Sequence, residues 1–201
     1  MKKFLGIVVL SLLWCNVGLT DAISEYDVAG AKLKISILEI MTEEEVMKNL
    51  ESRSWADEKY LIIKYDPDTS KYQNLEFDQY YLTIDSSDEN LPIVGISALI
   101  FFKTDFDACI KKQNQYANKY EKIFKIKKEV LPIQDFSDKY GPGSEWRPII
   151  FERPNFKRLK SDTASVLCYH YGTSPENDLF GEDNLKINIL TREFADAITV
   201  K

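Results

Sequence analysis

The period of apolar and polar residues changes several times along this chain, and these changes predict its strands and helices. Two aromatic-rich runs, Tyr60 to Tyr65 and Phe77 to Ile84, have the length and composition of strands. The apolar run from Ile93 to Phe102 follows a polar turn and predicts a hairpin with the second of them. Because this run is apolar on both faces, we expect it to lie centrally in a sheet.

A long amphipathic segment follows the hairpin. From Phe106 to Phe124, residues that suit a core recur every three or four positions, and Cys109 is among them. The motif Thr104-x-x-Asp107 is a capping box, which places the start of a helix here. We therefore expect one long helix that packs Cys109 and its stripe against the sheet.

Two short helices are predicted near the N-terminus. Thr42-x-x-Glu45 is a capping box, in which hydroxyl and carboxylate each satisfy a free backbone N–H. The preceding stretch is ambiguous: residues 33–37 alternate as in a strand, whereas Ser36-x-x-Glu39 is a second capping box. We favour the helix here, and thus an N-terminal helix pair.

The C-terminal third predicts a second meander. Strand patterns cover Arg147 to Glu152, Thr163 to Tyr171 and Leu185 to Ile189, and Thr191 can cap a short terminal helix. The order of elements predicts an α+β fold: an N-terminal helix pair, an antiparallel meander sheet, one long amphipathic helix packed on the sheet, and a short C-terminal helix.

The first 22 residues are typical of a secretory signal peptide. Lys2 and Lys3 precede an apolar run, Phe4 to Trp14, that is shorter than the ~20 residues a membrane span needs. We expect cleavage after Ala22, with Thr20 as the alternative site, so the mature domain is 23–201. Cys15 could be the lipidated cysteine of a lipoprotein signal. The residue before such a cysteine should be small, because the signal peptidase pocket is narrow there, and Trp14 is bulky. The prediction is a periplasmic or secreted protein that meets the membrane only through its signal peptide.

Charge and length narrow the class further. The formal net charge is −6 for the whole chain, and loss of Lys2, Lys3 and Asp21 makes it −7 for the mature part. A net acidic surface argues against nucleic acid, whose phosphates require clustered cations. The mature length suits a single domain able to bury its own core.

Two cysteines, Cys109 and Cys168, stay in the mature chain. An even number of cysteines in an oxidising compartment predicts a disulfide. Two separate buried thiols are the alternative. A redox thiol has no support because the chain lacks a Cys-x-x-Cys motif.

The chain carries few signs of catalysis. His170 is the only histidine, so a multi-histidine metal centre within one chain is excluded. Cys168 and His170 would share one strand face with Cβ atoms ~6–7 Å apart, which is long for a nucleophile and its base. The chain has no Gly-x-Ser-x-Gly elbow, no P-loop and no dinucleotide fingerprint. We expect no catalytic, metal or cofactor-binding residue, and we favour a protein that is not an enzyme while leaving that question open.

Three stretches carry a resemblance: the signal sequence Met1 to Asn16, and the stretches Leu38 to Glu45 and Phe102 to Cys109. With them the chain resembles small exported proteins of unknown function from compact-genome marine alphaproteobacteria. That resemblance implies an envelope location and no catalytic residue. At the level of fold alone, the expected helices and sheet resemble periplasmic domains of the outer-membrane-assembly lipoprotein and β-lactamase-inhibitor kind, which bind proteins through the sheet or its loops.

Two functional hypotheses follow. The first is a non-enzymatic envelope module that binds an unknown protein or peptide partner through Tyr80, Tyr81 and Trp146, the amphipathic aromatics that interfaces favour. Strand alternation separates Tyr80 from Tyr81 and makes Tyr81 the better candidate for an exposed position. The alternative is a small-molecule or glycan binder or hydrolase with a pocket beside His170. A concave pocket with His170 and two converging carboxylates would favour this alternative.

Overall fold

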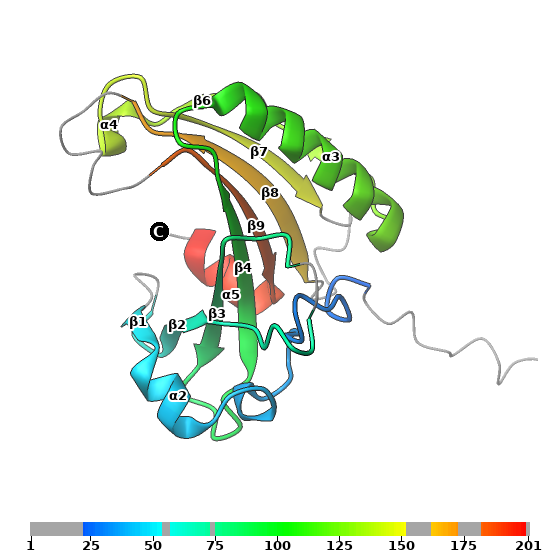
Figure 1. The fold of residues 1–201 in the computed structure, drawn as a ribbon, viewed down its shortest axis with the longest axis vertical. Helices are drawn as coiled ribbons and strands as arrows, with labels where there is room; N and C mark the ends of the chain where they lie inside the picture. The colour runs from blue at the N-terminus through cyan, green and yellow to red at the C-terminus, as the bar shows by residue number, and fades with distance from the viewer. Residues whose placement is uncertain (1–21, 54–56, 73–74, 152–161, 173–181, 200–201) are drawn as a thin grey trace, which may run out of the picture.

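The computed structural model describes residues 22–53, 57–72, 75–151, 162–172 and 182–199, and these residues form an α+β fold around one antiparallel sheet (Figure 1). The predicted hairpin is confirmed and lies at the centre of that sheet. Its arms are β3 (Gln79–Asp85) and β4 (Ile93–Phe101), paired so that Tyr81 lies opposite Ser97.

Two meanders meet at β4. The first runs through β1 (Leu50–Arg53), β2 (Tyr60–Tyr65) and β3 to β4. The second runs through β7 (Glu145–Phe151) and β8 (Thr163–His170) to β9 (Asn184–Leu190), which pairs antiparallel with β4. The two-residue strands β5 (Glu129–Val130) and β6 (Gln134–Asp135) both pair with β7. The expected central position of β4 is therefore confirmed.

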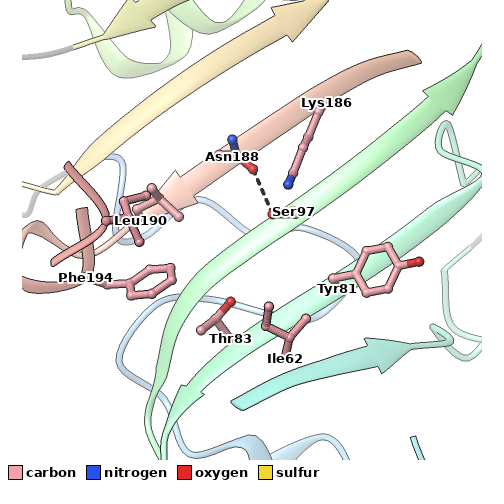
Figure 2. A pocket seen from close by; sticks show the side chains of 9 residues that line it. Ile62, Tyr81, Thr83, Ser97, Lys186, Asn188, Leu190 and Phe194 are labelled. Carbon is pink, nitrogen blue, oxygen red and sulfur yellow. Dashed lines mark hydrogen bonds between the residues drawn. The ribbon is translucent and has the colours of Figure 1, made fainter. Parts of the chain in front are cut away.

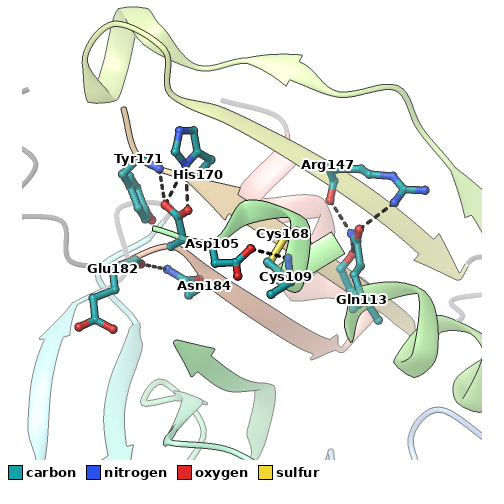
Figure 3. The surroundings of a disulfide bond; sticks show 12 residues. Asp105, Cys109, Gln113, Arg147, Cys168, His170, Tyr171, Glu182 and Asn184 are labelled. Carbon is teal, nitrogen blue, oxygen red and sulfur yellow. Dashed lines mark hydrogen bonds and ion pairs between the residues drawn. A yellow bond between two sulfur atoms is a disulfide. The ribbon is translucent and has the colours of Figure 1, made fainter. Parts of the chain in front are cut away.

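One face of the sheet is covered by helix α3 (Phe106–Phe124) and the N-terminal segment. The helix lies over β7, β8 and β9 and buries Tyr116, Tyr120 and Phe124. The predicted disulfide between Cys109 and Cys168 is confirmed: it joins α3 to β8 with Cα atoms 6.0 Å apart (Figure 3). We call this side of the sheet the covered face.

Gln113 shows how a polar side chain is accommodated in the covered face. It is fully buried in α3, and its Nε2 donates hydrogen bonds to the backbone oxygens of Arg147 (2.7 Å) and Val166 (2.8 Å). Because a buried amide without partners is costly, these two bonds fix the height at which α3 sits on β7 and β8.

The opposite face is concave, and α5 (Arg192–Thr199) lies within its hollow (Figure 1). The ring of Phe194 packs against that of Tyr60, with centroids 4.8 Å apart. Gly95 permits this approach, because a Cβ there would lie 3.2 Å from side-chain atoms of Phe194, Leu190 and Thr83. The predicted C-terminal helix is confirmed, and we call this side of the sheet the concave face.

The predicted N-terminal helix pair is wrong. Both capping boxes form, but the first opens only a 3-10 helix, η1 (Ile37–Glu39), and the second opens the six-residue helix α2 (Glu43–Lys48). The segment before η1 is instead held along β4, where Lys34 N–H donates to the Ile93 oxygen at 2.8 Å and Ile93 N–H donates to the Ile35 oxygen at 2.9 Å. These bonds keep the backbone extended up to the N-cap Ser36, and the extended N-cap Thr42 of α2 leaves room for only one helical turn between the two caps.

Other boundaries also differ from expectation. The N-cap of α3 is Asp105, whose side chain accepts from the Ala108 N–H, and not Thr104. The edge strand β1 and the one-turn helix α4 (Ser137–Tyr140) were not predicted.

The predicted signal peptide falls on residues 1–22, of which 1–21 lie outside the described residues, so its cleavage and the 23–201 domain stay predictions. Within the described ranges, no helix is both long and apolar enough to cross a bilayer.

Candidate functional site

The concave face holds a pocket of about 310 Å³ beside α5 (Figure 2). That volume is at the low end of the range found for small-molecule sites. Strands β2, β3, β4 and β9 form its floor, and α5 forms one wall. The lining side chains are those of Ile62, Tyr81, Thr83, Ser97, Lys186, Asn188, Leu190, Phe194 and Ile198.

The register of the sheet explains why these side chains meet. Antiparallel pairing places Tyr81, Ser97 and Asn188 side by side across three strands. Residues two apart along a strand share a face, so Lys186 and Leu190 flank Asn188 on the same side of β9. The pocket therefore has a polar end near Lys186 and an apolar end near Leu190.

Two hydroxyls on the pocket floor already have acceptors within the protein. The hydroxyl of Ser97 donates to Oδ1 of Asn188 at 2.7 Å, and the hydroxyl of Tyr81 donates to Oε1 of Gln79 at 2.8 Å. Burial raises the pKa of Tyr81, so its phenol stays protonated at neutral pH.

Lys186 brings a cationic side chain into the pocket lining. Its side chain is half-buried and extends from β9 towards Ser97 on β4 (Figure 2). Burial lowers the pKa of its ammonium group. Within the described part of the chain, the side chain of Lys186 has no hydrogen-bond or ion-pair partner. An unpaired cation in a pocket is costly, because desolvation is not offset by a counter-charge.

The other end of the pocket is apolar. Phe194 is buried, and Ile62, Leu190 and Ile198 are half-buried around it. Lys186 and Leu190 are four residues apart on β9, which places their Cα atoms about 13 Å apart along the strand. A ligand that touches both ends must therefore be extended and must change polarity along its length.

The three aromatics of the first hypothesis do not share one surface. Tyr80 is only 5% exposed on the covered face, where its ring packs edge-on against Phe77 and Tyr65. Tyr81 lines the pocket on the concave face, as alternation along β3 predicts. Trp146 belongs to the concave face as well, but it stacks on Tyr169 at 5.8 Å, at the end of the sheet away from α5. Only Tyr81 and Trp146 are therefore on the same side.

His170 is not part of the pocket. By alternation along β8 it shares the side of Cys168 (Figure 3). Its ring lies 5.5 Å from that of Phe106 on α3. Its Nδ1 lies 2.8 and 3.0 Å from the two oxygens of Asp183, which also accepts from the Tyr171 N–H. Among the described residues, Asp183 is the one carboxylate within hydrogen-bond distance of the ring. The described residues therefore do not provide the two converging carboxylates that the hydrolase hypothesis needs.

Metal chemistry has no visible site in the described ranges. No group of three or more histidine, cysteine, aspartate or glutamate side chains in these ranges could hold an ion. Cys109 and Cys168, the thiols that a zinc site with His170 would need, are joined in the disulfide.

Besides the predicted exposure of Tyr81, the polar pattern of β9 was the sequence signal for this pocket. Lys186 and Asn188 alternate with buried Leu185 and Ile187, a pattern that ordinarily indicates a solvent-facing side. Nothing in it shows that α5 returns over that side. Comparison of the chain with protein-family models, with curated proteins and with solved structures finds no match in any of the three. The function must therefore be argued from the site itself.

Proposed function

We propose that this protein is a non-enzymatic binding module that holds a small molecule in the pocket on its concave face. The observation that carries the proposal is Lys186, a half-buried cation without a partner among the described residues, at one end of a cavity of about 310 Å³. A cavity with an apolar wall and a few converging polar groups is the usual form of a ligand site.

The pocket chemistry favours binding over turnover. Among the residues that the structure describes, its lining includes no carboxylate, histidine or cysteine side chain. Hydrolysis needs a general base or a nucleophile activated by one, and Lys186 and Tyr81 lack such a partner in the wall. His170 lies on the other side of the sheet, which removes the support for a hydrolase beside that residue.

An exported location belongs to the same proposal. The disulfide supports an oxidising compartment, because such bonds are rare in proteins of the cytosol. The predicted signal peptide and the resemblance to small exported alphaproteobacterial proteins favour the periplasm or the exterior. In that setting, the module would bind its ligand in the cell envelope.

A peptide or protein partner in the envelope is the second candidate function. It is supported by the aromatic cluster on the concave face beyond the pocket, where the rings of Trp146, Tyr169 and Tyr171 lie nearly parallel at 5.8 and 6.3 Å. Aromatic side chains of this kind are enriched in interfaces. The pocket is favoured over this cluster because it combines a cavity with an unpaired charge.

The test is a two-dimensional NMR titration of the 23–201 protein with a small-molecule fragment library. We expect the largest shifts at the amides of Ser97, Asn188 and Leu190. Ile62→Trp should abolish them by filling the pocket, whereas Ile62→Leu, of equal volume, should keep them. Absence of any ligand that shifts these amides would refute the proposal, and shifts confined to Trp146 and Tyr169 on addition of peptides would favour the second candidate.

A further inference from the structure

The charge of the pocket is carried by one group. Among the lining residues that the structure describes, Lys186 alone has a cationic side chain, and Tyr81, Ser97 and Asn188 provide neutral polar atoms around it. The protein as a whole is acidic, with a formal net charge of −6. A single lysine suits a single negative charge, because a dianionic phosphate is usually held by several donors or by arginine forks.

The hydrogen bonds already formed in the pocket show which of its groups remain available to a ligand. The Ser97 hydroxyl is engaged with Asn188 and the Tyr81 hydroxyl with Gln79. The three N–H donors of the Lys186 ammonium have no acceptor in the described part of the chain. An incoming acceptor of negative charge would satisfy them, and it would offset the desolvation of the cation.

The opposite end of the pocket selects for the rest of the ligand. Leu190 and Ile198 leave part of their apolar surface uncovered beside the buried ring of Phe194. Covering such surface stabilises a complex by ~25 cal/mol per Å². The distance of about 13 Å between the Cα atoms of Lys186 and Leu190 requires a body longer than acetate or formate.

We propose that the ligand is a small amphipathic carboxylate, whose anionic group binds Lys186 and whose apolar body extends along β9 to Leu190, Ile198 and Phe194. This inference rests on the proposed function, since it names the ligand class of the same pocket. It makes Lys186 the residue that sets specificity for charge, and α5 the element that sets specificity for the apolar body.

The experiment compares three probes of equal chain length: octanoate, octanamide and octylammonium. By calorimetry at neutral pH, we expect octanoate to bind wild-type protein at least tenfold more tightly than octanamide, and octylammonium most weakly. A hydrogen bond to a charged group is strong enough for this preference. Lys186→Met should lower the affinity for octanoate to the level measured for octanamide. The affinity for octanamide itself should not change.

Matched variants separate charge from shape. Lys186→Arg should keep the preference for octanoate because it keeps the cation. Lys111→Met is the control, since Lys111 is exposed on α3, on the other side of the sheet, and its loss should change no affinity. Should Lys186→Met fail to fold, the comparison of octanoate with octanamide on wild-type protein still decides the question.

The failures of the two proposals can be told apart. If octanamide or octylammonium binds as tightly as octanoate, or if none of the three binds while another library compound shifts the Ser97 and Asn188 amides, the carboxylate inference is wrong and the pocket remains a binding site. If no compound shifts those amides, the proposed function fails together with the inference.

Discussion

The two faces of the sheet are built from the same strands, but one is packed as a core and the other is partly open and holds the pocket. On the covered face, adjacent strands place Ile63, Leu82 and Ile96 side by side, each at most 2% exposed, under the N-terminal segment and α3. On the concave face, the neighbouring positions hold Ile62, Tyr81 and Ser97, which line a cavity. One-residue alternation along each strand therefore separates a packed core from a partly open surface.

The faces also differ in how they treat buried polarity. Gln113 on the covered face is fully buried, and both hydrogens of its amide have acceptors. Lys186 on the concave face is half-buried, and its ammonium has no acceptor in the described ranges. The buried polar group of the core thus has hydrogen-bond partners and contributes to stability. The polar group of the pocket remains available for a ligand, at a cost to stability. Such costs are typical of binding sites.

The largest expected effect comes from the disulfide of the covered face. The bond closes a loop whose ends are 59 residues apart, so replacing Cys109 and Cys168 by alanine should lower the free energy of unfolding by about 4 kcal/mol. Denaturant unfolding of the 23–201 protein measures this loss. Two titratable thiols in protein purified without reductant would show that the bond is absent.

Adjacent isoleucines on β2 test the two faces directly. Ile63→Ala should cost about 3 kcal/mol, because Ile63 is fully buried opposite Leu82 and its removal leaves a cavity. Ile62→Ala should cost about 1 kcal/mol, because Ile62 is half-buried in the pocket wall. Denaturant midpoints of the two variants give the comparison, and equal losses would contradict the division into a packed and an open face.

Two tyrosines extend the test to alkaline pH. On the covered face the Tyr65 hydroxyl donates to the Ala29 oxygen at 2.6 Å, so Tyr65→Phe should cost about 1 kcal/mol at pH 7. Burial raises the pKa of Tyr65 to about 12. The unfolded tyrosine ionises near pH 10, so the stability that this side chain contributes is lost as the pH rises from 10 through 12. Unfolding measured between pH 8 and 12 should therefore show the difference between wild type and Tyr65→Phe shrinking. Tyr81→Phe, on the concave face, is the matched comparison, and a larger loss there at pH 7 would reverse the expected order.

The smallest effect has the opposite sign. Lys186→Met should raise the free energy of unfolding by up to about 1 kcal/mol at neutral pH, because it removes a desolvated cation and leaves a side chain of similar length. Lys111→Met, at an exposed position, should change stability by less. Chemical unfolding in parallel decides the sign, and a loss of stability in Lys186→Met would show that the lysine is not a burden on the folded state.

Local features of the fold could be predicted from the sequence. The β3–β4 hairpin, the long helix α3, the capping boxes of Ser36 and Thr42 and the short α5 all depend on residues within a few positions of one another. The division of Tyr80 from Tyr81 also follows from alternation alone. The cysteine pair could be named because the expected cleavage after Ala22 removes Cys15 and leaves only one pairing.

Other features could not be predicted, because they depend on distant segments. The segment around Ser36 is held along β4 by bonds to Ile93 and Leu91, which are more than fifty residues away. The edge strand β1 lacks an apolar alternation of its own and exists through pairing with β2. From the sequence alone, the side of β9 that carries Lys186 and Asn188 is expected to face solvent. In the structure α5 lies beside that side and forms a wall of the pocket.

By itself, the sequence determined the β3–β4 hairpin, the long helix α3, the separation of Tyr80 and Tyr81 onto opposite faces, and the identity of the disulfide partners. Only the tertiary structure decided that β9 lies beside β4 and that α5 returns over the concave face. The pairing of β9 with β4 places Lys186 near Ser97. The position of α5 leaves a cavity between the strands and Phe194. The physical reason is that propensity and alternation act over a few residues, whereas strand order is set by which apolar faces can be buried together.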